Sequence, residues 1–462
     1  SGDIQFAFRE EQGDAERGYL YLNTDSNVIN DGVEREAAST YTGRTYVGNI
    51  GGDADGKAIT VVFGKNNAFG NTSNLYVHDD SSVWFADKDL QTKHTQTVGG
   101  LTGSGELNFG NAAEVTLKQT STDNGNTDIT THTVRVDNVF TGSGNAVFHI
   151  DLSALKTEDN DPLYEIFFTD QPEKNEYTAL IDLTGGAVTA YRADRQQVVG
   201  DETYTGLNGI LLGSTLRLNT DGWLRVDTTG EVNNLILNSN SGLEFSGLGI
   251  IDQDQSGALV VGRDLTLNSD ATVSIKDMNY DHDDLVGDTG LISADNGLLN
   301  HLIYVKENIN NTGNHSLSLD DDNLKPVTSD ILQGDNDQKV KVATGTWQLE
   351  SNLRYDETNR TFDLAYVLTK VAIEDDQTLL IEGEANATAK QDFTALITDA
   401  ETGSGNVTFA AGEGATGNGT IIEVGNSATS EVNSYTGKTT VEAGTKVVLV
   451  EDSALGKTSE LL

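Results

Sequence analysis

Two acidic clusters hold the residues of this sequence that are best suited to chemistry. Paired carboxylates can act as acid and base on a glycosidic bond, coordinate calcium, or accept hydrogen bonds from sugar hydroxyls. The spacing leaves these three chemistries open, and a solvated acidic loop is the fourth alternative. The candidate ligand-binding residues, in chain order, are Asp252, Asp254, Lys276, Asp277, Asp281 and Asp283.

The second acidic cluster departs from the pattern of an EF-hand calcium loop. It alternates acidic and amide side chains from Asp277 to Asp283, but His282 stands where an EF-hand loop needs glycine, and no flanking helix is predicted. The seven histidines show no paired spacing, and cysteine is absent. We therefore expect no metal site, no cofactor, no catalytic triad and no enzymatic activity.

Short strands must position these clusters. Three segments repeat apolar residues at alternate positions: Leu216–Asn219, Leu235–Asn238 and Leu265–Asn268. A second strand starts eight residues after the start of each segment, and further copies of this unit are predicted at Leu20 and Leu75. This pattern predicts strand, turn and strand units that stack in parallel with one face buried.

Stacking of the repeats has two consequences. Asn219, Asn238 and Asn268 should lie above one another, about 4.8 Å apart, where their amides can form a hydrogen-bonded ladder. Phe245 and Ile275 should end equivalent strands, so the loops that carry the two acidic clusters should leave the same side as neighbours.

A second signature, Thr-Gly-Ser-Gly, occurs at Thr102–Gly105, Thr141–Gly144 and Thr402–Gly405. Such glycines can cradle a phosphate when a helix N-terminus follows them. A strand pattern follows all three copies, so we interpret them as tight turns.

Composition excludes several classes of partner. The chain has 29 Lys and Arg against 72 Asp and Glu, a formal charge of −43. This charge argues against nucleic acids, whose phosphates need basic partners, and against anionic membrane surfaces. With 49 glycines and only three prolines, the composition indicates short strands joined by many turns.

The tryptophans and the prolines mark other segments of interest. Trp84, Trp223 and Trp347 are candidates for sugar-stacking platforms or protein anchors, with core or turn packing as the alternative. Residues 156–203 and 284–341 interrupt the repeats and contain all three prolines. We expect irregular excursions there, where partners are usually contacted.

A third signature resembles a known family. Tyr435–Val441, followed by Gly444, Thr445 and Ser453–Gly456, is similar to the passenger-associated repeat of bacterial autotransporters, and Tyr41–Val47 with Asn67–Gly70 is a diverged copy. The chain is most similar to type V autotransporter passengers of the AIDA-type adhesin family, the uropathogenic autotransporter adhesins among them.

This resemblance implies an all-β fold, a single-stranded right-handed parallel β-helix that forms one elongated passenger domain over residues 1–462. It implies display on the extracellular side of the bacterial outer membrane, or release from there. The signal peptide and the translocator barrel of the family would be absent from this chain, and membrane attachment would come only through that barrel.

The function that the resemblance implies is non-enzymatic adhesion during colonisation, with a host extracellular-matrix protein such as fibronectin, or host glycans including glycosaminoglycans, as partner. The charge of −43 disfavours sulfated glycans and favours a protein with a basic patch. Two alternatives remain: a passenger that self-associates in autoaggregation and biofilms, and a β-helix enzyme that degrades polysaccharides with Asp252, Asp254, Asp277 or Asp281.

Overall fold

The structure of the chain, a computed structural model, describes residues 3–6, 17–22, 28–30, 33–35, 42–48, 58–63, 66–68, 72–86, 93–120, 127–128, 132–155, 164–169, 175–192, 196–199, 202–205, 207–227, 229–246, 258–276, 292–293, 300–320, 325–327, 331–333, 340–343, 346–373, 375–383, 390–393, 395–399, 403–412, 419–425 and 432–462.

The described residues form two compact units. Unit 1 takes Ser1–Gly247, Ser256–Lys276 and Ile303–Ser318, and unit 2 takes Leu248–Gln255, Asp277–Leu302 and Leu319–Leu462. Almost all regular elements are β-strands, and η2 (Gly209–Leu212) is a single turn of 3-10 helix.

Unit 1 is built from three sides, which the chain visits in turn. We name the first side the asparagine sheet. Its strands, all parallel, are β9 (Thr95–Val98), β12 (Glu114–Lys118), β16 (Val147–Asp151), β19 (Leu180–Thr184), β23 (Thr215–Leu218), β26 (Asn234–Leu237), β29 (Leu265–Leu267) and β33 (Ile309–Asn310).

We name the second side the tryptophan sheet. It consists of β13 (Thr127–Asp128), β14 (Thr133–Val136), β17 (Glu165–Phe168), β20 (Gly186–Ala190), β24 (Gly222–Asp227), β27 (Gly242–Ser246), β30 (Ala271–Lys276) and β34 (Leu317–Asp320). β13 is antiparallel to β14, and the pairs from β14 to β30 are parallel.

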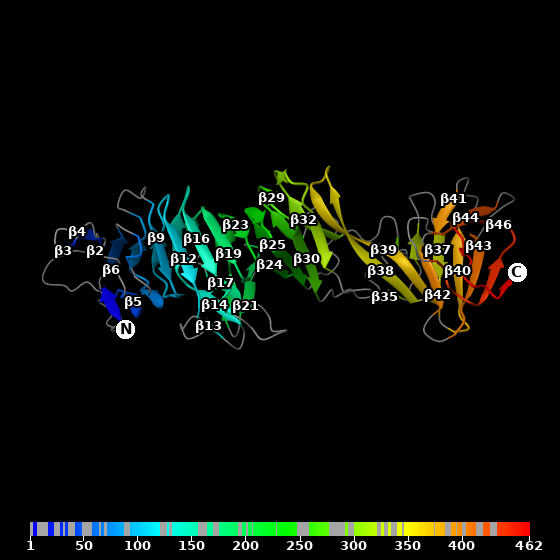
Figure 1. The fold of residues 1–462 in the computed structure, drawn as a ribbon, viewed down its shortest axis with the longest axis horizontal. Helices are drawn as coiled ribbons and strands as arrows, with labels where there is room; N and C mark the ends of the chain where they lie inside the picture. The colour runs from blue at the N-terminus through cyan, green and yellow to red at the C-terminus, as the bar shows by residue number, and fades with distance from the viewer. Residues whose placement is uncertain are drawn as a thin grey trace. The chain divides into compact units, whose positions relative to one another are not determined.

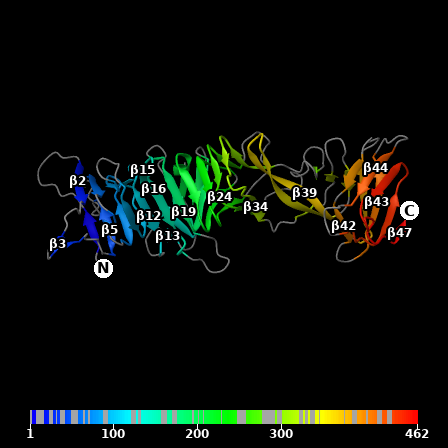
Figure 2. The ribbon, with the colours of Figure 1, turned by 45° about the horizontal axis from the view of Figure 1, so that its top comes forward.

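The third side is formed by two sheets. They contain β2 (Arg17–Leu22), β6 (Ala58–Phe63), β8 (Ser82–Trp84), β11 (Glu106–Asn108), β15 (Val139–Gly142) and β18 (Glu176–Tyr177), and then β25 (Gly230–Val232), β28 (Leu259–Val261) and β32 (Asn300–Val305). A further sheet joins β1 (Ile4–Phe6), β5 (Arg44–Val47), β7 (Asn74–Val77) and β10 (Leu101–Thr102). Figures 1 and 2 show the strands of unit 1, coloured blue to green, stacked side by side.

The predicted repeats stack in register. Leu216 pairs with Leu235, and Leu235 with Leu265, so equivalent apolar residues form columns across β23, β26 and β29. These leucines are buried because alternate side chains of a strand point to one face. Phenylalanines extend the core, with ring centroids 5.3 Å apart for Phe85 and Phe109.

Unit 2 combines parallel and antiparallel strands. Its longest strands, β38 (Thr346–Asp356) and β39 (Thr361–Ile373), form an antiparallel hairpin. The other strands are β31 (Ile292–Ser293), β35 (Lys325–Val327), β36 (Ile331–Gln333), β37 (Val340–Ala343), β40 (Thr378–Gly383), β41 (Lys390–Phe393), β42 (Leu396–Asp399), β43 (Asn406–Ala411), β44 (Thr420–Val424), β45 (Lys438–Val441), β46 (Thr445–Leu449) and β47 (Glu460–Leu461). β37 pairs antiparallel with β40, and the pairs that follow β40 along the chain are parallel.

The two copies of the motif that carries the family resemblance form the same hydrogen bonds. The Thr45 and Thr72 hydroxyls lie 2.8 Å apart, and Thr72 Oγ1 donates to the carbonyl of Gly43 over 2.9 Å. In the second copy the corresponding distances are both 2.9 Å, and the residues are Thr439, Thr458 and Gly437. The internal repeat is therefore present in the hydrogen bonding as well as in the sequence.

Residues 156–203 do not form an irregular excursion, and that prediction is wrong where the structure describes them. β17, β19 and β20 continue the tryptophan and asparagine sheets in parallel register. The alternation that marks other strands is hidden here, because Ile166–Phe168 and all of β20 are buried. Pro162 and Pro172 lie outside the described residues.

The prediction for 284–341 is wrong in part for a related reason. β32 pairs with β28 and β33 pairs with β29, both in parallel, so residues 303–310 continue the coils of unit 1. Long intervening segments separate these strands in sequence, which hid their period. Pro326 lies in β35, which pairs antiparallel with β38 in unit 2.

The predicted repeat copies at Leu20 and Leu75 form strands, but neither strand joins the sheet of the central copies β23, β26 and β29. β2 pairs with β6 on the third side, whereas β7, the strand of the Leu75 copy, lies in the sheet with β1 and β5. The second strand of the Leu20 copy, β3 (Val28–Asn30), pairs antiparallel with β4 (Val33–Arg35). An alternating apolar pattern shows that a strand has a buried face, but not which sheet it joins.

Both fully described Thr-Gly-Ser-Gly segments of unit 1 are followed by strands, as the sequence predicts. Thr102–Gly105 precedes β11, and Thr141–Gly144 precedes β16. The two turns stand at different corners, since β11 belongs to the third side and β16 to the asparagine sheet. The hairpin β21 (Gln196–Val199) and β22 (Glu202–Thr205) completes the described elements.

Candidate functional site

Asp252, Asp254, Asp277, Asp281 and Asp283 lie outside the described residues, and only the backbone of Lys276 is described. Lys276 ends β30 and is the register partner of Ser246 at the end of β27, and Phe245 pairs with Ile275. The strands that precede the two acidic loops are therefore neighbours, as predicted.

The three predicted ladder asparagines form a hydrogen-bonded row on the outside of the asparagine sheet. Asn238 Nδ2 donates to Asn219 Oδ1 over 2.7 Å, and Asn268 Nδ2 donates to Asn238 Oδ1 over 3.0 Å. Each asparagine follows the last residue of its strand, so the parallel register brings the amides together. Asn219 extends the row by donating to Asp182.

Asp182 is the centre of a polar cluster on the same sheet. Arg217 donates from Nε and Nη2 to its two carboxylate oxygens, each over 2.8 Å, and His149 Nδ1 lies 2.8 Å from Oδ2. The three residues occupy one outward row, because His149 pairs with Asp182 and Asp182 with Arg217.

The environment holds Asp182 in its ionised form. Burial alone would raise the pKa of this carboxyl, but hydrogen bonds from Arg217, His149 and Asn219 outweigh it and set the pKa well below 3.8. A carboxylate of this kind is a hydrogen-bond acceptor and a poor proton donor. It suits recognition better than acid catalysis.

The tryptophan sheet carries a second cluster, with a cation at its centre. Arg225 Nη1 donates to Glu165 Oε2 over 3.0 Å, and Arg225 Nε lies 3.1 Å from Glu244 Oε1. Thr189 also donates to Glu165. Burial raises the pKa of Glu165, and the positive charge of Arg225 opposes that shift without cancelling it.

Trp223 lies beside this cluster. It faces outward from β24, two residues before Arg225, and pairs with Gly242 on β27. A Cβ atom placed on Gly242 would lie 2.3 Å from Trp223 Cζ3, so the six-membered ring covers the position where a side chain would stand. Trp84 is also half-buried, and only the backbone of Trp347 is described.

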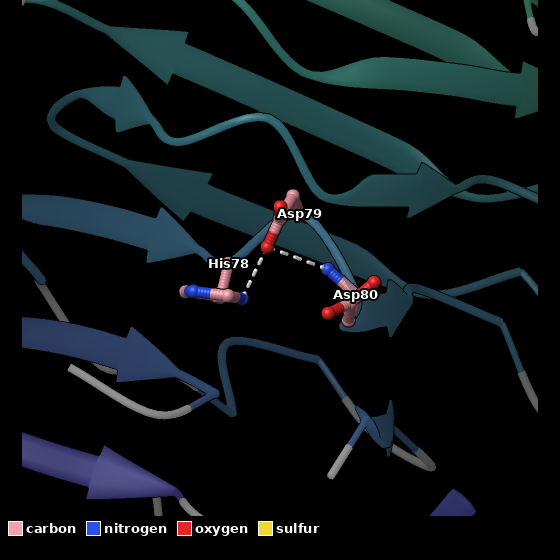
Figure 3. Close-up of side chains that lie close together, drawn as sticks. All are labelled: His78, Asp79 and Asp80. Carbon is pink, nitrogen blue, oxygen red and sulfur yellow. Dashed lines mark hydrogen bonds and ion pairs between the residues drawn. The ribbon is translucent and has the colours of Figure 1, made fainter. Parts of the chain in front are cut away.

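A third group of polar side chains lies on the turn between β7 and β8. His78, Asp79 and Asp80 offer ligand atoms within 4.8 Å of one another, and Figure 3 shows the His78 ring and the Asp80 backbone directed at the Asp79 carboxylate. Asp80 N donates to Asp79 over 3.0 Å. Paired histidine spacing gave no signal for this group, because its three members are consecutive.

Sequence reasoning missed the Asp182 and Glu165 clusters. Their partners lie far apart in the chain, 35 residues for Asp182 and Arg217 and 60 for Glu165 and Arg225. The available signal was a charged residue at an outward position of an apolar strand, as in Leu180–Thr184.

Comparisons of the chain with protein-family models, with curated proteins and with solved structures gave no match. Within the part of the chain that the structure describes, no helix has the length and apolar character needed to cross a membrane.

Proposed function

We propose that this chain is a right-handed parallel β-helix that acts as a non-enzymatic adhesin at the bacterial surface. Its partner would be an extended host glycan or an extracellular-matrix protein such as fibronectin. We assign a right-handed coil because connections between parallel strands are almost always right-handed. Surface display rests on the resemblance of Tyr435–Val441 to the autotransporter passenger repeat.

The observation that carries this proposal is the continuous polar row on the asparagine sheet. Asp182, Asn219, Asn238 and Asn268 come from consecutive strands and are joined by hydrogen bonds. Parallel strands lie about 4.8 Å apart, so the row presents polar groups at a regular interval to a linear partner. Because the hydrogen bonds hold these side chains in place, binding would cost little side-chain entropy.

Charge orders the candidate partners. With a net charge of −43, the chain repels sulfated glycosaminoglycans at long range and attracts proteins with basic patches. Neutral glycans do not experience this long-range repulsion. Glycosaminoglycan binding would therefore require local basic residues and should weaken steeply with added salt.

A binding screen on arrayed glycans and matrix proteins, at low and physiological salt, tests the proposal. Ile236 is a half-buried outward residue between Arg217 and Thr266 on the asparagine sheet, so Ile236→Arg should obstruct the row without removing its hydrogen bonds. We expect this variant to lose binding at least about tenfold.

Val260→Arg on β28 is the matched control, because Val260 is an outward aliphatic residue on the third side. It should bind as the unchanged chain does. Absence of any partner under all conditions, or equal loss in both variants, would count against the asparagine sheet as the binding face.

A second candidate function, cleavage of a polysaccharide, is favoured by one observation. The raised pKa of Glu165 suits a general acid, and Glu244 is a second carboxylate on the same arginine. Arg225 stands between the two carboxylates, which argues for binding instead. Release of reducing ends that is lost in both Glu165→Gln and Glu244→Gln would establish the enzyme, and inertness on a polysaccharide panel would remove it.

A further inference from the structure

We propose that Trp223 is the stacking platform of a subsite for one uncharged pyranose ring, with Arg225 and Glu244 as its hydrogen-bonding partners. This inference rests on the proposed glycan-binding function and deepens it. It assigns a second contact surface, the tryptophan sheet, and a class of sugar, a neutral hexose or N-acetylhexosamine.

The platform is formed by a large ring over the smallest residue. Trp223 covers Gly242, whose missing side chain lets the ring approach the backbone of β27. Ala187, the register partner of Trp223 on the other side, is also small. Trp223 is half-buried while Gly242 beneath it is fully buried, which indicates that one ring face rests on the sheet and the other meets solvent. A pyranose ring packs its C–H groups on such a face.

Polar groups border the platform on the side that a bound sugar would occupy. Glu244 follows Gly242 by two residues on β27, and Arg225 is ion-paired to it at 3.1 Å. Thr272 and Ser274 are the register partners of Gly242 and Glu244 on β30, and both are half-buried. Carboxylate, guanidinium and hydroxyl groups together supply acceptors and donors for sugar hydroxyls.

The indole N–H adds a free donor. The side chain of Trp223 forms no hydrogen bond within the part of the chain that the structure describes, and its indole nitrogen is not among the buried polar atoms without a partner. The donor is therefore open to solvent and can donate a hydrogen bond to a sugar oxygen.

The charge of the border selects the class of sugar. Two carboxylates, Glu165 and Glu244, share one guanidinium, so the cluster has no excess positive charge and becomes negative when both carboxyls are ionised. A sulfate or uronate group would meet this charge in addition to that of the whole chain. A neutral ring meets no such repulsion, and its hydroxyls can pair with both signs of charge.

The test measures binding of neutral tetrasaccharides of β-linked glucose and N-acetylglucosamine, and of a heparin tetrasaccharide, by titration calorimetry and tryptophan fluorescence. We expect the unchanged chain to bind a neutral tetrasaccharide in preference to heparin. Trp223→Ala should weaken that binding at least about tenfold, and Trp223→Phe should retain most of it.

Gly242→Ala is the second variant, because its added methyl group displaces the ring while every proposed contact residue remains. It should weaken neutral-sugar binding as well. Trp84→Ala, which removes a half-buried tryptophan on β8 of the third side, is the matched control and should bind normally. Circular dichroism confirms that each variant is folded.

Three results would overturn the subsite: no binding of either neutral tetrasaccharide, a preference for heparin, or unchanged affinity in Trp223→Ala and Gly242→Ala. The proposed function fails separately. If a matrix protein or another glycan still binds and Ile236→Arg abolishes it, adhesion stands without this subsite. If nothing binds at all, both proposals fall.

Discussion

The asparagine sheet and the tryptophan sheet of unit 1 order their outward charges in opposite ways. On the first, the carboxylate of Asp182 accepts hydrogen bonds from Arg217, His149 and Asn219. On the second, the guanidinium of Arg225 forms ion pairs with the carboxylates of Glu165 and Glu244. One cluster therefore has an anion surrounded by donors, and the other a cation shared between anions.

The difference gives the two sheets opposite responses to pH. Donors favour the charged form of Asp182 and hold its pKa below 3.8, whereas burial raises the pKa of Glu165 above 4.5 against the opposing charge of Arg225. Asp182 thus contributes stability that is present above pH 3.8 and is lost as the pH falls through its folded-state value. Glu165 contributes stability that is present below pH 4.5 and is lost as the pH rises through its folded-state value.

The largest effect is expected for Asp182→Ala. The change leaves Arg217 and His149 without their shared acceptor on a partly buried surface, and we expect a loss of about 3 kcal/mol in the free energy of unfolding. Urea denaturation at pH 7 measures it. Asp182→Asn should cost less, and its deficit should shrink below pH 3.8, where the unfolded chain's aspartate is protonated.

Thr116→Ala, an outward change two strands away in the same row, is the control and should cost little. A loss for Asp182→Asn that does not depend on pH would contradict the ionised state assigned to Asp182.

The asparagine row was predictable from sequence, and the Asp182 cluster was not. Repeated Leu-x-Leu-Asn segments reveal both the strand and its register, since the same residue type recurs at the same place. His149, Asp182 and Arg217 differ in type, and only the observed pairing of β16, β19 and β23 brings them into one row.

The tryptophan sheet shows a second limit. The sequence suggested Trp223 as a candidate platform, but it did not predict the contact with Gly242, because that glycine resembles the many turn glycines of the chain. The sequence also failed to predict β17 and β20, where residues on consecutive positions are buried and the alternation of a half-exposed strand is lost. Whether both faces of a strand are buried depends on how the coils pack, which the sequence of one strand does not reveal.

An intermediate effect is expected from the middle of the asparagine row. Asn238 is hydrogen-bonded to Asn219 and to Asn268, whereas Asn268 is exposed and has one such bond. Asn238→Ala should lower the free energy of unfolding by about 1.5 kcal/mol and Asn268→Ala by about 0.5 kcal/mol. Parallel urea titrations compare the two, and equal losses would show that the row does not act as a ladder.

The smallest effect, in Glu165→Gln, separates the two sheets most sharply. A protonated glutamate and a glutamine have similar shapes and hydrogen bonds, so the variant and the unchanged chain should be about equally stable near pH 4. As the pH rises, the unchanged chain must ionise a buried carboxyl whose pKa is raised, so the variant should become progressively more stable than the unchanged chain. The difference between the two unfolding curves isolates Glu165 from all other titrating acids, because those are common to both chains. A variant that instead loses stability with rising pH would mean that the attraction of Arg225 outweighs burial, and the contrast between the sheets would then be one of geometry alone.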